Sequence, residues 1–166
     1  MTEASVVDDP AAAEITARAR VLVRTLARRW TPARQLPTHP VHGDIRLGNV
    51  AVAPSDDPVY LDFGFAAVRP RIHELAYSLF WIVLRPDDTG RPEQFDWAAI
   101  DELIGAYEQS AHSRLDDRER SALPAYLAAV PLYLAGVAGY TPDPVATLRG
   151  EEASLRIAEW VLTHLT

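Results

Sequence analysis

The stretch Val41-His42-Gly43-Asp44-Ile45-Arg46-Leu47-Gly48-Asn49-Val50 decides how the fold of this chain is interpreted. Pro37 and Pro40 come directly before it and exclude a helix there, so the chain enters Val41 in an extended conformation. The polar, glycine-containing residues from His42 to Gly48 therefore form a loop. This loop ends at an amide side chain, Asn49, where a more apolar segment begins.

Two short segments after the loop, residues 49–53 and 59–63, are rich in β-branched or aromatic residues. Residues 54–58 between them, Pro-Ser-Asp-Asp-Pro, have the composition of a turn. This pattern predicts a β-hairpin. A hairpin closed at residues 54–58 would bring Asn49 and Asp62 to its open end.

The rest of the chain shows the periodicity of amphipathic helices. Helices are predicted over residues 10–30, 72–84, 96–107, 116–140 and 148–165. Pro124 and Pro131 should kink or split the fourth of these, and Gly139 to Pro144 should form a break. The fold class is therefore mainly α with one small β-hairpin. Residues 1–9 are expected to form a flexible tail, and residues 10–166 a single domain.

The composition narrows the class of protein. The chain has 166 residues, of which 48 % are hydrophobic and 23 % charged, with a formal net charge of -7. These values are typical of a globular protein, and an acidic chain is a poor partner for nucleic acid. The charge is compatible with a cationic substrate. No apolar run is expected to approach the roughly 20 residues that span a bilayer, and no signal peptide is evident, which indicates a cytoplasmic protein without membrane contact.

The acids and amides of the loop and the hairpin suggest phosphoryl transfer, which requires an oriented hydroxyl, a base and a magnesium ion. Asp44 could accept the hydroxyl proton, and Arg46 could contact the γ-phosphate. Asn49 and Asp62 offer oxygen ligands of the kind that magnesium prefers. The chain has no cysteine, so thiolate metal sites and cysteine nucleophiles are excluded.

Residues 42–49 resemble the catalytic loop of the aminoglycoside phosphotransferase and choline or homoserine kinase group, and residues 61–64 resemble its metal-binding strand end. Residues 71–76 are similar to the stretch that opens the next core helix, with Glu74 where Asp is usual. The resemblance implies the C-terminal lobe of a protein-kinase-like (α+β) fold, which uses ATP and Mg²⁺ to phosphorylate a small-molecule hydroxyl. By the same resemblance Asp44 is the catalytic base, and Asn49 and Asp62 hold magnesium.

The same family has an N-terminal lobe with a glycine-rich loop and a strand lysine that binds the nucleotide phosphates. All sixteen basic residues other than histidine are Arg here, and no glycine precedes Gly43. The N-lobe is therefore expected to be missing from this chain, and no residue for binding the nucleotide base is assigned. Three explanations stay open: a partner chain or self-association that supplies the N-lobe, a degenerate binding module, or a metal-dependent phosphoesterase.

Simpler roles compete for individual residues. In an arbitrary protein Asp44 would most often cap a turn, and Arg46 could be a solvated surface residue. His42 is expected to brace the loop through hydrogen bonds. The other histidines have no metal-ligand spacing and are expected to be structural or exposed: His39, His73, His112 and His164.

Overall fold

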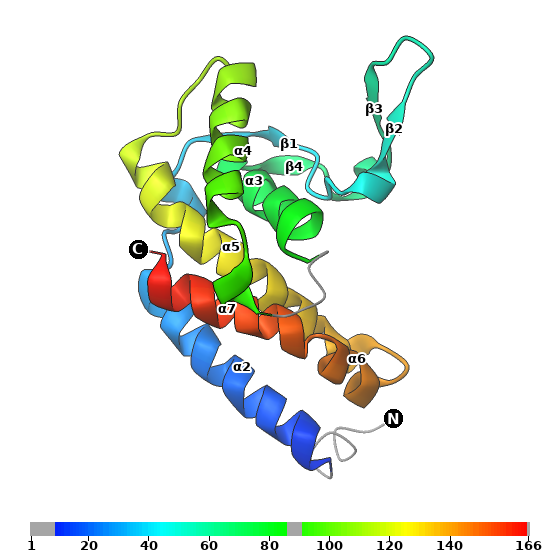
Figure 1. Cartoon of the computed structure of the whole chain (residues 1–166), viewed down its shortest axis with the longest axis vertical. Coiled ribbons are helices and arrows are strands. Elements are labelled where there is room, and N and C mark those ends of the chain that lie inside the picture. The colour runs from blue at the N-terminus through cyan, green and yellow to red at the C-terminus, as the bar shows by residue number, and fades with distance from the viewer. Residues whose placement is uncertain (1–8, 86–90, 166) are drawn as a thin grey trace.

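A computed structural model describes residues 9–85 and 91–165 of the chain. The described part is mainly helical, as predicted (Figure 1). The α-helices are α2 (Pro10–Arg29), α3 (Arg71–Leu79), α4 (Trp97–Ser110), α5 (Asp117–Val137), α6 (Pro144–Gly150) and α7 (Glu152–His164). The predicted N-terminal tail lies outside the described residues except for Asp9.

Helix α2 begins where the sequence indicates. The Asp9 side chain accepts a hydrogen bond from the Ala12 backbone N–H, and Pro10 occupies the first turn, where its missing N–H costs nothing. Ile15 and Leu22 are buried on one face. The helix ends at Arg29, and the chain then turns toward the first strand.

The structure has two small antiparallel sheets rather than the one hairpin predicted. Strands β2 (Val50–Val52) and β3 (Pro58–Tyr60) form the expected hairpin, with Val50 opposite Tyr60, but both strands are shorter than predicted. The second sheet pairs β1 (Thr38–Val41) with β4 (Ala67–Pro70). Sequence reasoning missed it because each strand carries a proline, which an edge position tolerates.

Helix α5 forms the centre of the core and packs against α7, α3 and α2 (Figure 1). It continues through Pro124 and Pro131, so the predicted split does not occur. Pro131 is fully buried, and packing on several sides compensates for the lost backbone hydrogen bonds. The chain is described as one helix from Asp117 to Val137.

The segment Asp117–Tyr140 is long and apolar enough to cross a membrane by length and composition. The expectation that no run approaches this length was therefore wrong. However, 61 % of its most apolar window is buried inside the protein. The core helix of a soluble protein meets the same criteria, so its place in the core accounts for the composition of α5.

Two other helices differ from the prediction. The helix expected over residues 72–84 is α3 followed by a π-helical segment, Phe80–Leu84. The last helix, expected over residues 148–165, is divided into α6 and α7 at Glu151. Glu151 is buried and pairs with Arg85, at 2.9 Å between the guanidinium and Oε1, and this pair ties the junction to the end of the π-helical segment.

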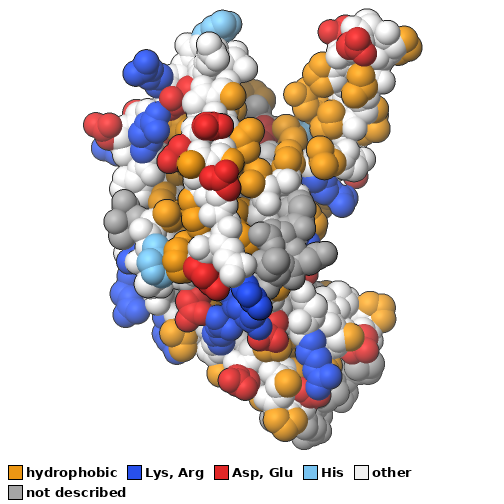
Figure 2. Space-filling model, viewed as in Figure 1, with side chains coloured by type: hydrophobic (Ala, Val, Ile, Leu, Met, Phe, Trp, Pro, Cys, Tyr) orange, Lys and Arg blue, Asp and Glu red, His pale blue; other side chains and the backbone are white. Residues whose placement is uncertain are grey.

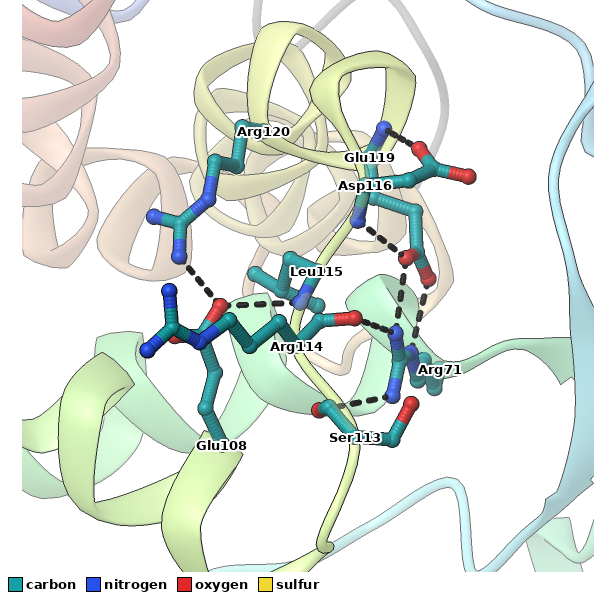
Figure 3. A network of polar contacts seen from close by, with 8 residues as sticks. All are labelled: Arg71, Glu108, Ser113, Arg114, Leu115, Asp116, Glu119 and Arg120. Atoms are coloured by element: carbon teal, nitrogen blue, oxygen red, sulfur yellow. Dashed lines mark hydrogen bonds and ion pairs between the residues drawn. The ribbon is translucent and has the colours of Figure 1, made fainter.

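A buried ion pair joins the start of α3 to the start of α5 (Figure 3). The Arg71 guanidinium donates to both carboxylate oxygens of Glu119 at 2.8 Å, and also to the backbone carbonyls of Ser113 and Arg114. Glu119 completes the predicted capping box with Asp116. Because Glu119 is only 1 % exposed, this bidentate pair fixes α3 against α5.

Candidate active site

Asp44 lies buried at the centre of the predicted loop and has partners from three directions. The Asn49 Nδ2 donates to the backbone oxygen of Asp44 at 2.9 Å and to its Oδ2 at 2.7 Å. The Tyr77 hydroxyl, from α3, donates to Oδ1 at 2.5 Å. The Arg46 Nε lies 3.4 Å from the same oxygen. The carboxylate is therefore held in one orientation by neutral donors and a half-exposed cation.

His42 uses both ring nitrogens to join the backbone of Asp44 to the backbone of Leu61. The Asp44 N–H donates to His42 Nδ1 at 3.3 Å, which places the proton of a neutral imidazole on Nε2. That atom lies 2.8 Å from the Leu61 carbonyl and donates to it. His42 therefore links the loop to the segment that leads to Asp62, which is the bracing role expected from the sequence.

Gly43 is held from two sides. Its N–H donates to the Glu74 carboxylate at 2.8 Å, so glutamate at this position does reach the loop. Its φ is +85°, and a Cβ at this position would lie 2.4 Å from the Phe65 carbonyl oxygen. Only glycine permits both this backbone conformation and this close approach.

Asp62 lies at the open end of the hairpin, as predicted. The Leu61 N–H donates to the Asn49 carbonyl at 2.9 Å, so the residue before Asp62 is bonded directly to Asn49. Asp62 is exposed and adopts a left-handed conformation, with φ of 60°, and its Oδ1 accepts a long 3.4 Å contact from the Gly64 N–H. In the described part of the chain, no polar contact joins the Asp62 side chain to Asp44 or Asn49.

A cavity of about 660 Å³ opens in front of Asp44. This volume lies in the range of small-molecule sites. Its walls come from the loop, β4, α3, α5 and the segment after α2. The lining residues are Trp30, Gly43, Asp44, Arg46, Phe65, Arg69, His73, Tyr77, Trp81, Tyr126, Ala129, Val130 and Tyr133.

Two cavity residues of α3 have shifted pKa values. Burial first, and then the hydrogen bond to Asp44, raise the pKa of Tyr77, so its hydroxyl stays protonated and donates to the carboxylate. Burial, with a smaller contribution from Arg69, lowers the pKa of His73 and favours its neutral form. The wall formed by α3 therefore has no charge of its own at neutral pH.

The side-chain oxygens of Asn49 and Asp62 are of the kind that magnesium prefers. Asn49 uses its amide nitrogen on Asp44, which leaves the amide oxygen for a cation, and the Asp62 carboxylate is exposed. Magnesium is held by one or two such protein oxygens together with water and phosphate oxygens, so the two residues fit. Among residues 9–85 and 91–165 there is no group of three or more His, Asp or Glu side chains that could hold a metal on their own.

Of the four site residues predicted from the sequence, the structure brings Asp44, Arg46 and Asn49 into direct contact and places Asp62 at the adjacent hairpin end. Sequence reasoning missed Tyr77 and expected His73 to be a structural or surface residue. Both lie on one face of α3, four residues apart, and Glu74 is three residues before Tyr77. That spacing, next to the loop motif, is the signal that could have identified them.

The family model described as "Phosphotransferase enzyme family" matches residues 3–123, a range that includes the loop, both sheets, α3 and α4. No curated protein and no solved structure matches the chain.

Proposed function

Since this chain belongs to the phosphotransferase enzyme family, we propose that it transfers the γ-phosphoryl group of ATP to the hydroxyl of a small molecule in the cytoplasm. The observation that carries the proposal is a buried carboxylate, Asp44, fixed in orientation by Asn49 and Tyr77 at the wall of a cavity of small-molecule size. A general base needs both a defined orientation and access to the acceptor.

In the proposed reaction the acceptor hydroxyl lies in the cavity and points toward Asp44. Asp44 takes the hydroxyl proton while the acceptor oxygen forms a bond to the γ-phosphorus. The bond from that phosphorus to the bridging oxygen breaks, and ADP leaves with the bonding electrons. Asn49 and Tyr77 each use one lone pair of the carboxylate oxygens, so further lone pairs remain for the acceptor proton.

Arg46 has a second role in this proposal. Its side chain is 45 % exposed and has only a 3.4 Å contact with Asp44, so its guanidinium is not saturated by that carboxylate. It can turn toward a phosphate that approaches the loop and stabilise the charge that develops there. Asn49 and Asp62 would hold a magnesium ion, which neutralises phosphate charge when it is bound.

The test separates nucleotide binding from transfer. Calorimetry of the purified chain with Mg²⁺ and ATP measures binding, and release of ADP with a panel of small alcohols measures transfer. We expect Asp62→Asn to weaken nucleotide binding strongly. Asp44→Asn should leave nucleotide binding unchanged and lower transfer by about 10² to 10⁴, the usual contribution of a general base.

Equal losses from both substitutions would contradict the separate roles. No heat with any nucleotide, even at high protein concentration, would contradict an enzyme that acts alone. Glu152→Gln is a matched control, because it removes a half-exposed carboxylate on α7 that does not line the cavity.

A second candidate, a kinase-derived module that depends on a partner chain, has its own support. The chain contains no lysine, and several large apolar side chains around the hairpin are exposed: Leu47, Val52, Phe63, Phe65 and Val68. Figure 2 shows hydrophobic side chains gathered over the projecting hairpin. Such a surface is typical of a contact site for a partner or a second copy. Size-exclusion chromatography with light scattering would show whether the chain self-associates.

A further inference from the structure

We infer that the cavity beside Asp44 takes an acceptor with a flat apolar body and a carboxylate, and that Arg69 binds this carboxylate. The acceptor hydroxyl would face Asp44, so this inference rests on the proposed function. The net charge of the whole chain favours a cationic substrate, whereas the side chains of the cavity itself favour an anion. The difference matters because a ligand at this depth meets the local charges first.

The apolar body is indicated by the walls of the cavity. Six aromatic side chains line it: Trp30, Phe65, Tyr77, Trp81, Tyr126 and Tyr133. Trp30 and Tyr126 stack on each other with ring centroids 4.3 Å apart, so they present a fixed aromatic surface. Aromatic surfaces of this kind bind flat rings through offset stacking and edge contacts.

The charges of the cavity favour an anion. Asp44 is the only carboxylate among the lining residues that the structure describes, and Arg46 already lies 3.4 Å from it. Arg69, on β4, has no carboxylate partner within the described ranges. Among the described residues, the polar contact that its guanidinium makes is with the His73 ring, 3.4 Å from Nε2. A ligand carboxylate would supply the bidentate partner that an arginine prefers.

A cationic ligand would meet two obstacles. The pair of guanidinium groups from Arg46 and Arg69 would repel it. In addition, the face of Trp81 is already in contact with cations of the protein, since Arg85 lies 4.4 Å and Arg46 5.8 Å from the ring centroid. The Trp81 face of the cavity wall is therefore already used for cation–π contacts.

Unsatisfied polar atoms in the wall also point to a missing partner. His73 Nδ1 and Trp81 Nε1 are buried and have no hydrogen-bond partner among the described residues. Buried polar groups without a partner are rare in folded proteins and commonly mark the place of a ligand or a water. Because His73 Nε2 contacts the Arg69 guanidinium, the ring that carries the unsatisfied Nδ1 and the arginine are neighbours in the cavity wall.

The test uses three probes that share a ring and a primary alcohol and differ in charge: 4-(hydroxymethyl)benzoate, 4-(hydroxymethyl)benzylamine and neutral 4-methylbenzyl alcohol. Quenching of the fluorescence of Trp30 and Trp81 in the full chain, without nucleotide, reports binding. We expect the benzoate to bind at least about tenfold more tightly than the amine, with the neutral alcohol between them. Equal affinities, a preference for the amine, or no binding of any probe would overturn the inference.

Substitution of the arginine identifies the group responsible. Arg69→Gln should remove the preference for the benzoate and leave the neutral alcohol unaffected, and Arg69→Lys should restore part of the preference. Arg24→Gln, on an exposed position of α2, is the matched control and should change nothing. A preference for the benzoate that survives Arg69→Gln would overturn the role of Arg69.

These results are separate from the test of phosphoryl transfer. If the benzoate binds through Arg69 but no phosphate is transferred, the assignment of the cavity stands and the proposed reaction fails. If transfer occurs to cationic alcohols alone, the reaction stands and the assignment of the cavity fails.

Discussion

Two buried carboxylates in this protein, Glu119 and Asp44, have opposite surroundings. Glu119 is 1 % exposed and receives a bidentate guanidinium at 2.8 Å, together with the Asp116 backbone N–H. Asp44 is 5 % exposed and receives an amide, a phenol and a guanidinium nitrogen 3.4 Å away. Glu119 lies outside the residues that line the cavity, and Asp44 lies at its wall. Two carboxylates that are buried alike can therefore differ in what they can do: Glu119 is saturated by a cation, whereas Asp44 keeps access to a cavity.

The largest loss of stability is expected when Glu119 loses its charge. Glu119→Gln leaves Arg71, whose side chain is 12 % exposed, without its counter-charge, and it should lower the free energy of unfolding by about 3 kcal/mol. Urea denaturation followed by circular dichroism measures it. Glu152→Gln is the control, because Glu152 pairs with Arg156 on the surface of α7, where such a pair is worth about 0.3–0.5 kcal/mol. Similar losses in both variants would show that Glu119 is not a structural brace.

The second prediction concerns the loop that holds Asp44. Gly43→Ala would place a Cβ 2.4 Å from the Phe65 carbonyl oxygen, in a backbone conformation that alanine rarely adopts. We expect a loss of about 1–3 kcal/mol of stability, together with lower transfer because Asp44 is displaced. Gly48→Ala is the matched control in the same loop, since a Cβ there meets no atom within 4 Å. Thermal unfolding of both variants measures the difference, and an unaffected Gly43→Ala would refute the close approach.

The third prediction removes one neutral donor of Asp44. Tyr77→Phe deletes the 2.5 Å hydrogen bond to Oδ1 and keeps the ring in the cavity wall. Stability should fall by about 1–2 kcal/mol, because a buried carboxylate loses a donor. Tyr133→Phe, an exposed residue of the same cavity, should change stability by less than about 0.5 kcal/mol. The two chemical denaturation curves would coincide if the Tyr77 hydroxyl did not support Asp44.

The smallest effect is expected from pH. Burial, and then Arg69, lower the pKa of His73 in the folded protein below its ordinary value of 6.5. As pH falls below 6.5 the unfolded chain binds a proton that folded His73 does not, so stability decreases from there toward the folded pKa. Thermal midpoints at half-unit steps between pH 8 and pH 5 should decline in this window, and His73→Asn should flatten the decline.

Glu119 would affect stability in a more acidic window than His73. Burial would raise its pKa, but the hydrogen bonds from Arg71 and the Asp116 N–H outweigh that effect and lower it. A carboxylate with a lowered pKa stabilises the fold above its ordinary value of 4.5, and this stability is lost as pH falls through the folded pKa. The two windows separate the contributions of the two residues.

Local signals predicted part of this structure well. The cap at Asp9, the capping box at Asp116 and the hairpin turn are short-range patterns, and each is present where the sequence indicates. The pairing of β1 with β4 was missed because it joins residues about thirty positions apart and each strand carries a proline. The path of α5 through two prolines was missed because packing, not propensity, decides it.

The same distinction holds for the site. Asp44, Arg46, Asn49 and Asp62 belong to contiguous motifs, so the sequence alone was enough to predict them as site residues. Tyr77 and His73 reach the site from α3, and Glu74 reaches Gly43 from the same helix. Their contacts depend on how α3 packs against the loop, and a local sequence pattern cannot predict that packing. The sign of the charge in the cavity also depends on the fold, because it is the fold that brings Arg46 and Arg69 to the same wall.

The hairpin of β2 and β3 stands apart from the body of the protein (Figure 1), and none of its six strand residues is fully buried. A two-stranded hairpin without a packed face is marginally stable in water, so its strands are expected to open and close more often than the core helices. Asn49 and Asp62 flank the two strands at the open end. The distance between these two expected magnesium-binding residues therefore depends on whether the strands are paired. An ion bound by both residues would stabilise the pairing of the strands. The Leu61 and Ala53 amides donate to the carbonyls of Asn49 and Asp57 across the hairpin. Their protection from hydrogen exchange would rise on binding, so the hairpin would report occupancy of the site from outside it.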